Sequence, residues 1–222
     1  MSRNQLLTPM FVNDSDTGLV IEGLRRYNAF TSVFFLGRHR RLLAEFVTLA
    51  GARPGDHALD IGCGPGKLVR ALGGATGPTG AAVGVDPSAT AVADNSDRDR
   101  AAQHRYVVGP AQELPLPDAE FDVVTCTFVM HHIPESRRDA AIAEMWRVLR
   151  PGGRLLLADA SPSPRMRAVL SLFLGRGGDP FADADIRHYT DQVEAVGFTE
   201  LTYRQSRDQT GILTAVKPVV HH

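Results

Sequence analysis

Glycines at alternate positions follow a carboxylate near residue 60, and this order of residue types suits a positively charged ligand. The segment is Asp60-Ile61-Gly62-Cys63-Gly64-Pro65-Gly66. Glycine lets the backbone approach a ligand closely or adopt a positive φ without steric cost. A dinucleotide loop would need its third glycine at Lys67, and a P-loop would need Ser or Thr at Leu68. Both phosphate-binding loops are therefore disfavoured, and the carboxylate would also repel a pyrophosphate.

Two adjacent histidines, His131 and His132, are the candidate catalytic residues. Successive side chains diverge on a regular element, so they cannot both face one site. A histidine titrates near neutral pH and could act as a base. Packing or contact with a bound ligand is the favoured interpretation, above all for His132. No HExxH or Cys/His ligand spacing occurs, so no metal site is expected.

Short apolar strands alternating with helices must position these residues. Strands are predicted at 57–61, 81–85, 105–108, 121–126 and 154–158. Helices are predicted at 67–72, 88–93 and 135–149. Two final strands, at 198–203 and 212–216, are expected to form a hairpin. The fold class is therefore α/β, a doubly wound, Rossmann-like sheet that is mostly parallel with an antiparallel C-terminal hairpin strand and helices on both faces.

Residues 1–222 are expected to form one domain in three parts. Residues 1–55 are predicted to be a helical cap because apolar residues recur there at three- and four-residue spacing. These residues are Phe30, Phe34, Phe35, Leu42, Leu43, Phe46 and Leu49. Residues 56–160 form the ligand-binding core, and 161–222 form a roof over the substrate and the final strands. In this last part, helices are predicted at 166–174 and from a capping Thr190 to Gly197.

From Ala58 to Asp159 the chain resembles the class I S-adenosylmethionine-dependent methyltransferases. The acidic residue and its glycines resemble the first motif of that family, whose ligand carries an ammonium and a sulfonium group. Asp86 matches the acidic residue that accepts hydrogen bonds from the ribose hydroxyls. Segment 109–116 resembles the stretch that meets the adenine edge, although Pro110 stands where the family often has Asp. Segments 121–133 and 149–155 resemble the later motifs.

The resemblance implies S-adenosylmethionine as cofactor, S-adenosylhomocysteine as product and a set of cofactor-binding residues. These residues are Asp60, Gly62, Cys63, Gly64, Gly66, Asp86, Pro87, Ser88, Ala111, Gln112, Thr127, Phe128 and His132. Gln112 could replace the contact that Pro110 lacks, and Cys63 would contribute its backbone only. Asp60 would either contact the cofactor or brace the loop. The resemblance is greatest to the ubiquinone/menaquinone-biosynthesis-like small-molecule methyltransferases.

The expected function is methyl transfer to a small apolar or aromatic metabolite, bound by residues that include Tyr27, His188 and Tyr189. Alternatives are a cyclase or lyase with the same cofactor, and an NAD-dependent oxidoreductase, which the glycine spacing disfavours. The net charge is −1 and no basic stripe carries aromatic residues, so no nucleic-acid partner is expected. The basic patch at 38–41 is interpreted as a solvated helix face.

The cellular setting is predicted from two further features of the chain. No apolar run approaches the roughly 18 residues of a membrane span, so no membrane partner is expected. Cys63 and Cys126 are the two cysteines, which predicts no disulfide and a reducing, cytoplasmic environment. Nothing in the sequence indicates the oligomeric state.

Overall fold

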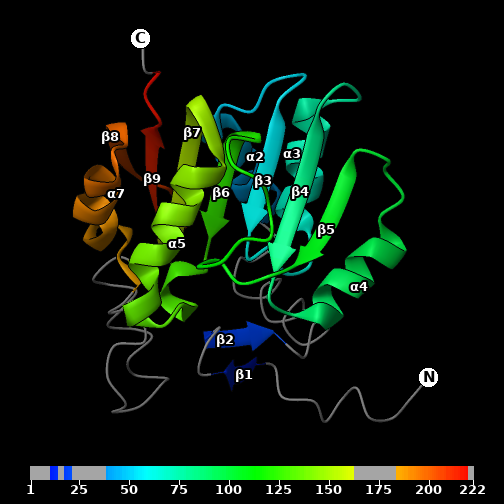
Figure 1. The fold of residues 1–222 in the computed structure, drawn as a ribbon, viewed down its shortest axis with the longest axis horizontal. Coiled ribbons are helices and arrows are strands. Elements are labelled where there is room, and N and C mark those ends of the chain that lie inside the picture. The colour runs from blue at the N-terminus through cyan, green and yellow to red at the C-terminus, as the bar shows by residue number, and fades with distance from the viewer. Residues whose placement is uncertain (1–10, 15–17, 22–38, 163–183, 220–222) are drawn as a thin grey trace.

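The computed structural model describes residues 11–14, 18–21, 39–162 and 184–219, and a seven-stranded sheet forms its centre (Figure 1). The strands are β3 (His57–Ile61), β4 (Ala81–Asp86), β5 (His104–Val108), β6 (Phe121–Thr127), β7 (Leu149–Ala160), β8 (Thr199–Gln205) and β9 (Thr210–Val216). Their spatial order is β5-β4-β3-β6-β7-β9-β8. β3 to β7 pair in parallel, whereas β9 is antiparallel to both β7 and β8. The predicted sheet with its antiparallel C-terminal hairpin is confirmed.

Helices cover both faces of this sheet. The described helices are α2 (His39–Ala50), α3 (Lys67–Thr76), α4 (Ala89–Arg98), α5 (Glu135–Val148) and α7 (Thr190–Val196), with the 3₁₀ turns η2 (Met130–His132) and η4 (Ile186–Tyr189). α2 and α3 pack on one face, and α5 and α7 pack on the other (Figure 1). In β3, Ala58 joins the α2 and α3 layer while Leu59 joins the α5 layer. Burial on both faces explains why these strands are continuously apolar.

The order in which strands are added to the sheet switches sides between β3 and β6. From β3 it runs outward to β4 and β5, and it then returns to the other side of β3 to form β6. Ligands of open α/β sheets bind at the carboxyl ends of the strands at such a point. The glycine loop follows β3, and η2 with its two histidines follows β6. Both candidate segments therefore lie at the same edge of the sheet.

The N-terminal part differs from the predicted helical cap. α2 is helical as expected, but β1 (Phe11–Asp14) and β2 (Gly18–Ile21) form an antiparallel hairpin, so the helical prediction is wrong for these two segments. Valine and isoleucine favour strands, and the polar stretch from Asn13 to Gly18 favours a turn. The hairpin lies beyond the carboxyl edge of the sheet (Figure 1), and β2 contacts η2. Outside the described residues lie Phe30, Phe34, Phe35 and the predicted helix 166–174.

Helix α7 corrects one further detail. Tyr189 occupies its N-cap position, and Thr190 is its first residue. The Thr190 hydroxyl donates to the Arg187 carbonyl at 2.9 Å, so it closes η4 and does not cap α7 as predicted. The helix ends before Gly197, whose φ is 115°, as expected. Among the described helices, none is long and apolar enough to cross a membrane.

Candidate functional site

The glycine loop after β3 has a backbone shape that requires glycine. Gly62, Gly64 and Gly66 have φ angles of 69°, 46° and 67°, a region that residues with a Cβ rarely adopt. A Cβ at Gly62 would clash with the methyl groups of Val129 from the loop after β6. A Cβ at Gly66 would lie 2.7 Å from Oδ1 of Asn95. The loop therefore presents bare backbone at the carboxyl edge.

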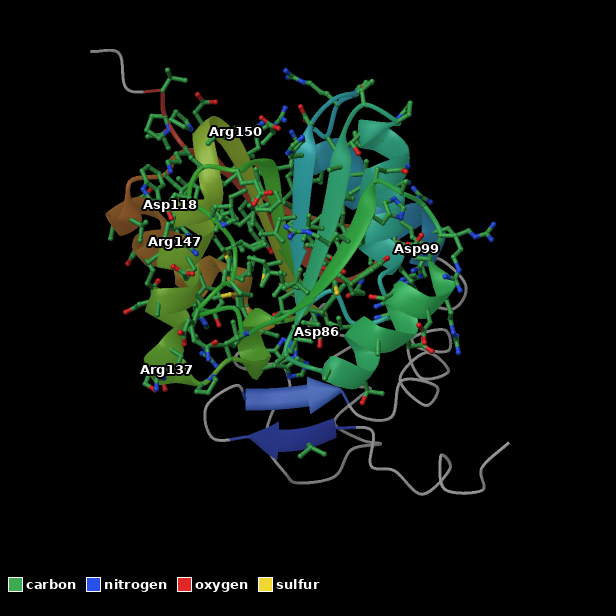
Figure 2. All side chains as sticks on the ribbon, turned by 45° about the vertical axis from the view of Figure 1, so that its right-hand side comes forward. Asp86, Asp99, Asp118, Arg137, Arg147 and Arg150 are labelled. Atoms are coloured by element: carbon green, nitrogen blue, oxygen red, sulfur yellow. The ribbon has the colours of Figure 1, made fainter. Side chains whose placement is uncertain are left out.

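Side chains of the next βα unit hold Gly64 from two sides. Its N–H donates to Oδ2 of Asp86 at 2.7 Å, and its carbonyl accepts from Nδ2 of Asn95 at 2.7 Å. The other oxygen of Asp86 accepts from the N–H of Ser88, which caps α4. Figure 2 shows Asp86 at the carboxyl end of β4, beside α4. Sequence analysis missed Asn95, whose signal was a polar residue one turn after the buried Ala91 on the inner face of α4.

Two buried carboxylates, Asp60 and Asp86, place negative charge at this edge of the sheet. Asp60 is 2% exposed, and its Oδ1 accepts from the Thr125 hydroxyl at 2.8 Å. Burial raises the pKa of Asp60 to about 7, against that hydrogen bond and with a contribution from Asp86. Burial also raises the pKa of Asp86. No lysine or arginine of the described residues pairs with either carboxylate, so a ligand with positive charge fits here.

Three further predicted cofactor residues follow β4 and β5 at the same edge. Pro87 comes directly after Asp86 and is partly exposed. In the loop after β5, Ala111 is buried and Gln112 is partly buried. The N–H of Gly109 donates to the carbonyl of Asp86 at 3.1 Å, which ties this loop to the end of β4. The loops that would surround an adenosine are thus linked to one another by the backbone of Asp86.

The predicted residues at the end of β6 sit on a constrained backbone. Thr127 is the last residue of the strand, and Phe128 has a positive φ of 59°. The N–H of Phe128 donates to the Ala158 carbonyl at 2.7 Å, while its ring lies 6.1 Å from that of Phe46 in α2. The ring therefore belongs to the α2 layer. The Cys63 thiol is buried and free, and burial raises its pKa.

His131, which is partly exposed, pairs with the buried Asp159 at the carboxyl edge of the sheet. Nδ1 of His131 lies 2.7 Å from Oδ2 of Asp159, a fully buried residue of β7. In the tautomer that carries its proton on Nδ1, the ring donates to this carboxylate and Nε2 keeps a lone pair. The His132 ring packs against that of His131, with centroids 3.9 Å apart and the ring planes tilted by 49°. Burial, with a contribution from His131, lowers the pKa of His132 to about 3, so this ring is neutral at physiological pH.

Of the three predicted substrate residues, the structure describes two, and these are neighbours in one 3₁₀ turn. Tyr27 lies outside the described residues. His188 and Tyr189 both belong to η4, where His188 is exposed and Tyr189 is 3% exposed. The guanidinium of Arg138 from α5 lies 5.9 Å from the centroid of the Tyr189 ring. Tyr189 is thus part of the core on the α5 face, and substrate contact by either residue stays a prediction.

Comparison with known proteins agrees with this geometry. A family described as "Methyltransferase domain" matches residues 59–157, the span that contains the loops described above. The ubiquinone/menaquinone biosynthesis C-methyltransferase UbiE of Burkholderia mallei (strain SAVP1) is 34% identical over 199 residues, covering 86% of this chain and 81% of that protein. The UbiE protein of Burkholderia thailandensis gives the same values. The chain belongs to the class I S-adenosylmethionine-dependent methyltransferases. Its cofactor is S-adenosylmethionine, which leaves as S-adenosylhomocysteine, and within the class the chain is similar to UbiE.

Solved structures share the fold at low sequence identity. A SAM-dependent methyltransferase from Aquifex aeolicus superposes with a TM-score of 0.66 at 18% identity, covering 79% of this chain and 89% of that one. The [4+2]-cyclase SpnF gives a TM-score of 0.64 at 22% identity and covers 81% of each chain. Such likeness shows the fold alone. The cyclase therefore gives no support to a cyclase reaction for this chain.

Proposed function

We propose that the chain methylates a carbon atom of a small apolar or aromatic metabolite, with His131 as the base. The relatives at 34% identity are named as C-methyltransferases, which supports carbon as the acceptor atom. The base assignment rests on one observation, the 2.7 Å contact between His131 and the buried Asp159. His132 is the poorer base, because its low pKa means that it binds a proton weakly.

The loops at the carboxyl edge would hold the cofactor through distinct contacts. The bare backbone from Gly62 to Gly66 admits close approach, and Asp60 offsets the positive charge. Each carboxylate oxygen of Asp86 already accepts one N–H and keeps a lone pair for a ribose hydroxyl. Ala111 and Gln112 would meet the adenine. When bound, the cofactor supplies an electrophilic methyl group on a positively charged sulfur.

His131 would act on an acceptor that carries a hydroxyl on an aromatic ring. Its Nε2 would accept the hydroxyl proton, and the freed electron pair would move through the ring so that a ring carbon takes the methyl group, whose bond to sulfur breaks with both electrons left on the sulfur. The proton on that carbon would then pass to solvent, which restores the aromatic ring, and the imidazolium would return its proton to the ring oxygen. The Asp159 carboxylate stabilises the imidazolium that forms and keeps the ring oriented. The β1–β2 hairpin, which contacts η2, would limit the access of water.

The test is turnover of labelled S-adenosylmethionine with small phenolic and quinol acceptors. His131→Gln should lower kcat by about 10²- to 10⁴-fold, the usual contribution of a positioned base. Asp159→Asn should lower kcat in the same direction, and neither change should alter the affinity for S-adenosylhomocysteine measured by calorimetry. His57→Gln, at the opposite edge of the sheet, is the matched control. Wild-type kcat in His131→Gln would rule out the base, and product formation without cofactor consumption would rule out methyl transfer.

The net charge and the two cysteines support the class of acceptor and the cellular setting that we propose. A net charge of −1 supports a small-molecule acceptor over a nucleic acid. Cys63 and Cys126 are both buried and unpaired, which supports the reducing, cytoplasmic setting.

A further inference from the structure

A groove of about 680 Å³ lies between α2 and the end of β8. Its lining residues come from two parts of the chain that are far apart in sequence. They are Arg41, Ala44, Glu45, Thr48, Leu49, Arg204, Gln205 and Arg207. None of them belongs to the glycine loop, to η2 or to the loops after β4 and β5. The groove is therefore lined by residues other than those assigned to the cofactor.

Three arginines line the groove, and none of them has a carboxylate partner among the residues that the structure describes. Within the described chain, no salt bridge involves Arg41, Arg204 or Arg207. Glu45 is the one carboxylate among the described lining residues, so these residues carry a formal charge of +2. From the sequence, the basic patch at 38–41 is interpreted as a solvated helix face. That interpretation does not account for Arg204 and Arg207, which line the same groove from β8 and the turn after it.

The two walls of the groove are fastened to each other. The hydroxyl of the buried Ser206, in the β8–β9 turn, donates to Oε2 of Glu45 on α2 at 2.7 Å. The N–H of Ser206 donates to the Thr210 carbonyl at 2.8 Å, which closes the turn. This arrangement holds the Glu45 carboxylate to the wall, so the arginines are the charged groups left for a ligand. Ala44 and Leu49 add apolar surface.

We infer that this groove binds the phosphate group of a small organic phosphate monoester. The guanidinium fork matches two phosphate oxygens at once, and arginine is the favoured residue for such contacts. A phosphate monoester carries a charge close to −2 at pH 7, which complements the +2 of the lining. The apolar surface of Ala44 and Leu49 suits a hydrocarbon or ring attached to the phosphate. The volume falls within the range of small-molecule sites, roughly 300–1,000 Å³.

Calorimetric titration of the full chain with phenyl phosphate tests this inference. Wild type should bind phenyl phosphate saturably and more tightly than inorganic phosphate, which lacks the apolar part. Arg41→Gln, Arg204→Gln and Arg207→Gln should each weaken binding by about tenfold, since each removes a charge-assisted contact. Arg100→Gln, an exposed arginine outside the groove, is the matched control and should bind as wild type does. S-adenosylhomocysteine affinity, measured on the same samples, should be unchanged in all four variants.

Three outcomes would overturn the inference. The first is no saturable binding of phenyl phosphate to the wild type. The second is equal affinity in the groove variants and in Arg100→Gln. The third comes from a second arm with phosphatidic acid vesicles: vesicle binding that depends on the arginines, with no binding of phenyl phosphate, would assign the groove to a lipid surface.

Discussion

Two residues at the carboxyl edge, Asp60 and Asp86, give the cofactor site its negative charge. Asp60 and Asp86 are both buried, and each accepts hydrogen bonds from neighbouring groups while no cation among the described residues neutralises it. Such carboxylates destabilise the folded chain in the ionised form and become favourable once a cationic ligand is bound. The site is thus prepared for the positive charge of its cofactor at some cost to the free protein.

The titration of Asp60 yields a prediction about stability. Its pKa of about 7 in the folded chain lies above the ordinary value of 3.8. Folding then binds a proton, so this group contributes stability that is fully present below pH 3.8 and is lost as the pH rises through 7. Between these pH values, the free energy of unfolding of the wild type should fall relative to Asp60→Asn by about 1.4 kcal/mol per pH unit. Urea unfolding without cofactor measures this, and parallel pH profiles would contradict it.

Sequence analysis could find the residues whose role depends on local spacing. The glycines and Asp86 stand at fixed intervals from a strand, and the order of the strands defines their edge. Asn95, Thr125 and Asp159 were not assigned because each acts through a partner 28 or more residues away. Such pairs depend on sheet register and helix docking, which no local pattern contains.

Among the elements, helix α3 shows how tightly the sheet and its helices fit. Two adjacent glycines, Gly73 and Gly74, sit in this helix but meet different surroundings. A Cβ on Gly73 would clash with the ring of His104 from β5, whereas a Cβ on Gly74 would meet nothing within 4 Å. The His104 ring is held in place because its Nδ1 lies 2.8 Å from Oδ2 of Asp99.

Alanine substitutions at Gly73 and Gly74 form a matched pair that tests this packing. Gly73→Ala should lower the free energy of unfolding by about 1–3 kcal/mol, because either α3 or the His104 ring must move. Gly74→Ala should raise it by about 0.5–1 kcal/mol, because alanine favours the helix and fits the open space. Urea denaturation of both variants provides the measurement. Equal stability of the two variants would show that α3 does not pack on β5 as described.

The N-terminal segment shows where the spacing of apolar residues fails to distinguish helices from strands. Apolar residues at three- and four-residue spacing predicted α2 correctly, and the same pattern was extended wrongly over β1 and β2. Four-residue strands such as Phe11–Asp14 are too short for a helical and a strand period to be distinguished. The turn-forming residues after Asn13 were the available signal for a hairpin.

At the scale of the whole molecule, ligand binding and folding are coupled through one edge of the sheet. The glycine loop, the end of β4, the loop after β5 and η2 all come together only in the folded sheet. A ligand that binds this edge therefore binds the native state and stabilises the entire fold by mass action.

S-adenosylhomocysteine should accordingly raise the thermal unfolding midpoint. At about 100 times its Kd the added stability is about 2.7 kcal/mol, or roughly 5–10 °C for a chain of this size. Asp86→Ala should weaken cofactor binding by about 1–3 kcal/mol and reduce the shift accordingly. Asp97→Ala, an exposed carboxylate of α4, should give the wild-type shift. Scanning fluorimetry measures the unfolding midpoint. If S-adenosylhomocysteine raised the midpoint of Asp86→Ala as much as that of the wild type, the role of Asp86 at the ribose would be refuted.

The position of β9 also constrains how the molecule can be assembled. β9 follows β8 along the chain but lies between β7 and β8 in the sheet. Until residues 210–216 have been synthesised, β8 has no strand to join and β7 presents an open edge with Leu155 and Leu157. Open apolar edges pair with other chains. Chains that stop before residue 210 should therefore aggregate, and nascent chains need protection until this stretch emerges from the ribosome.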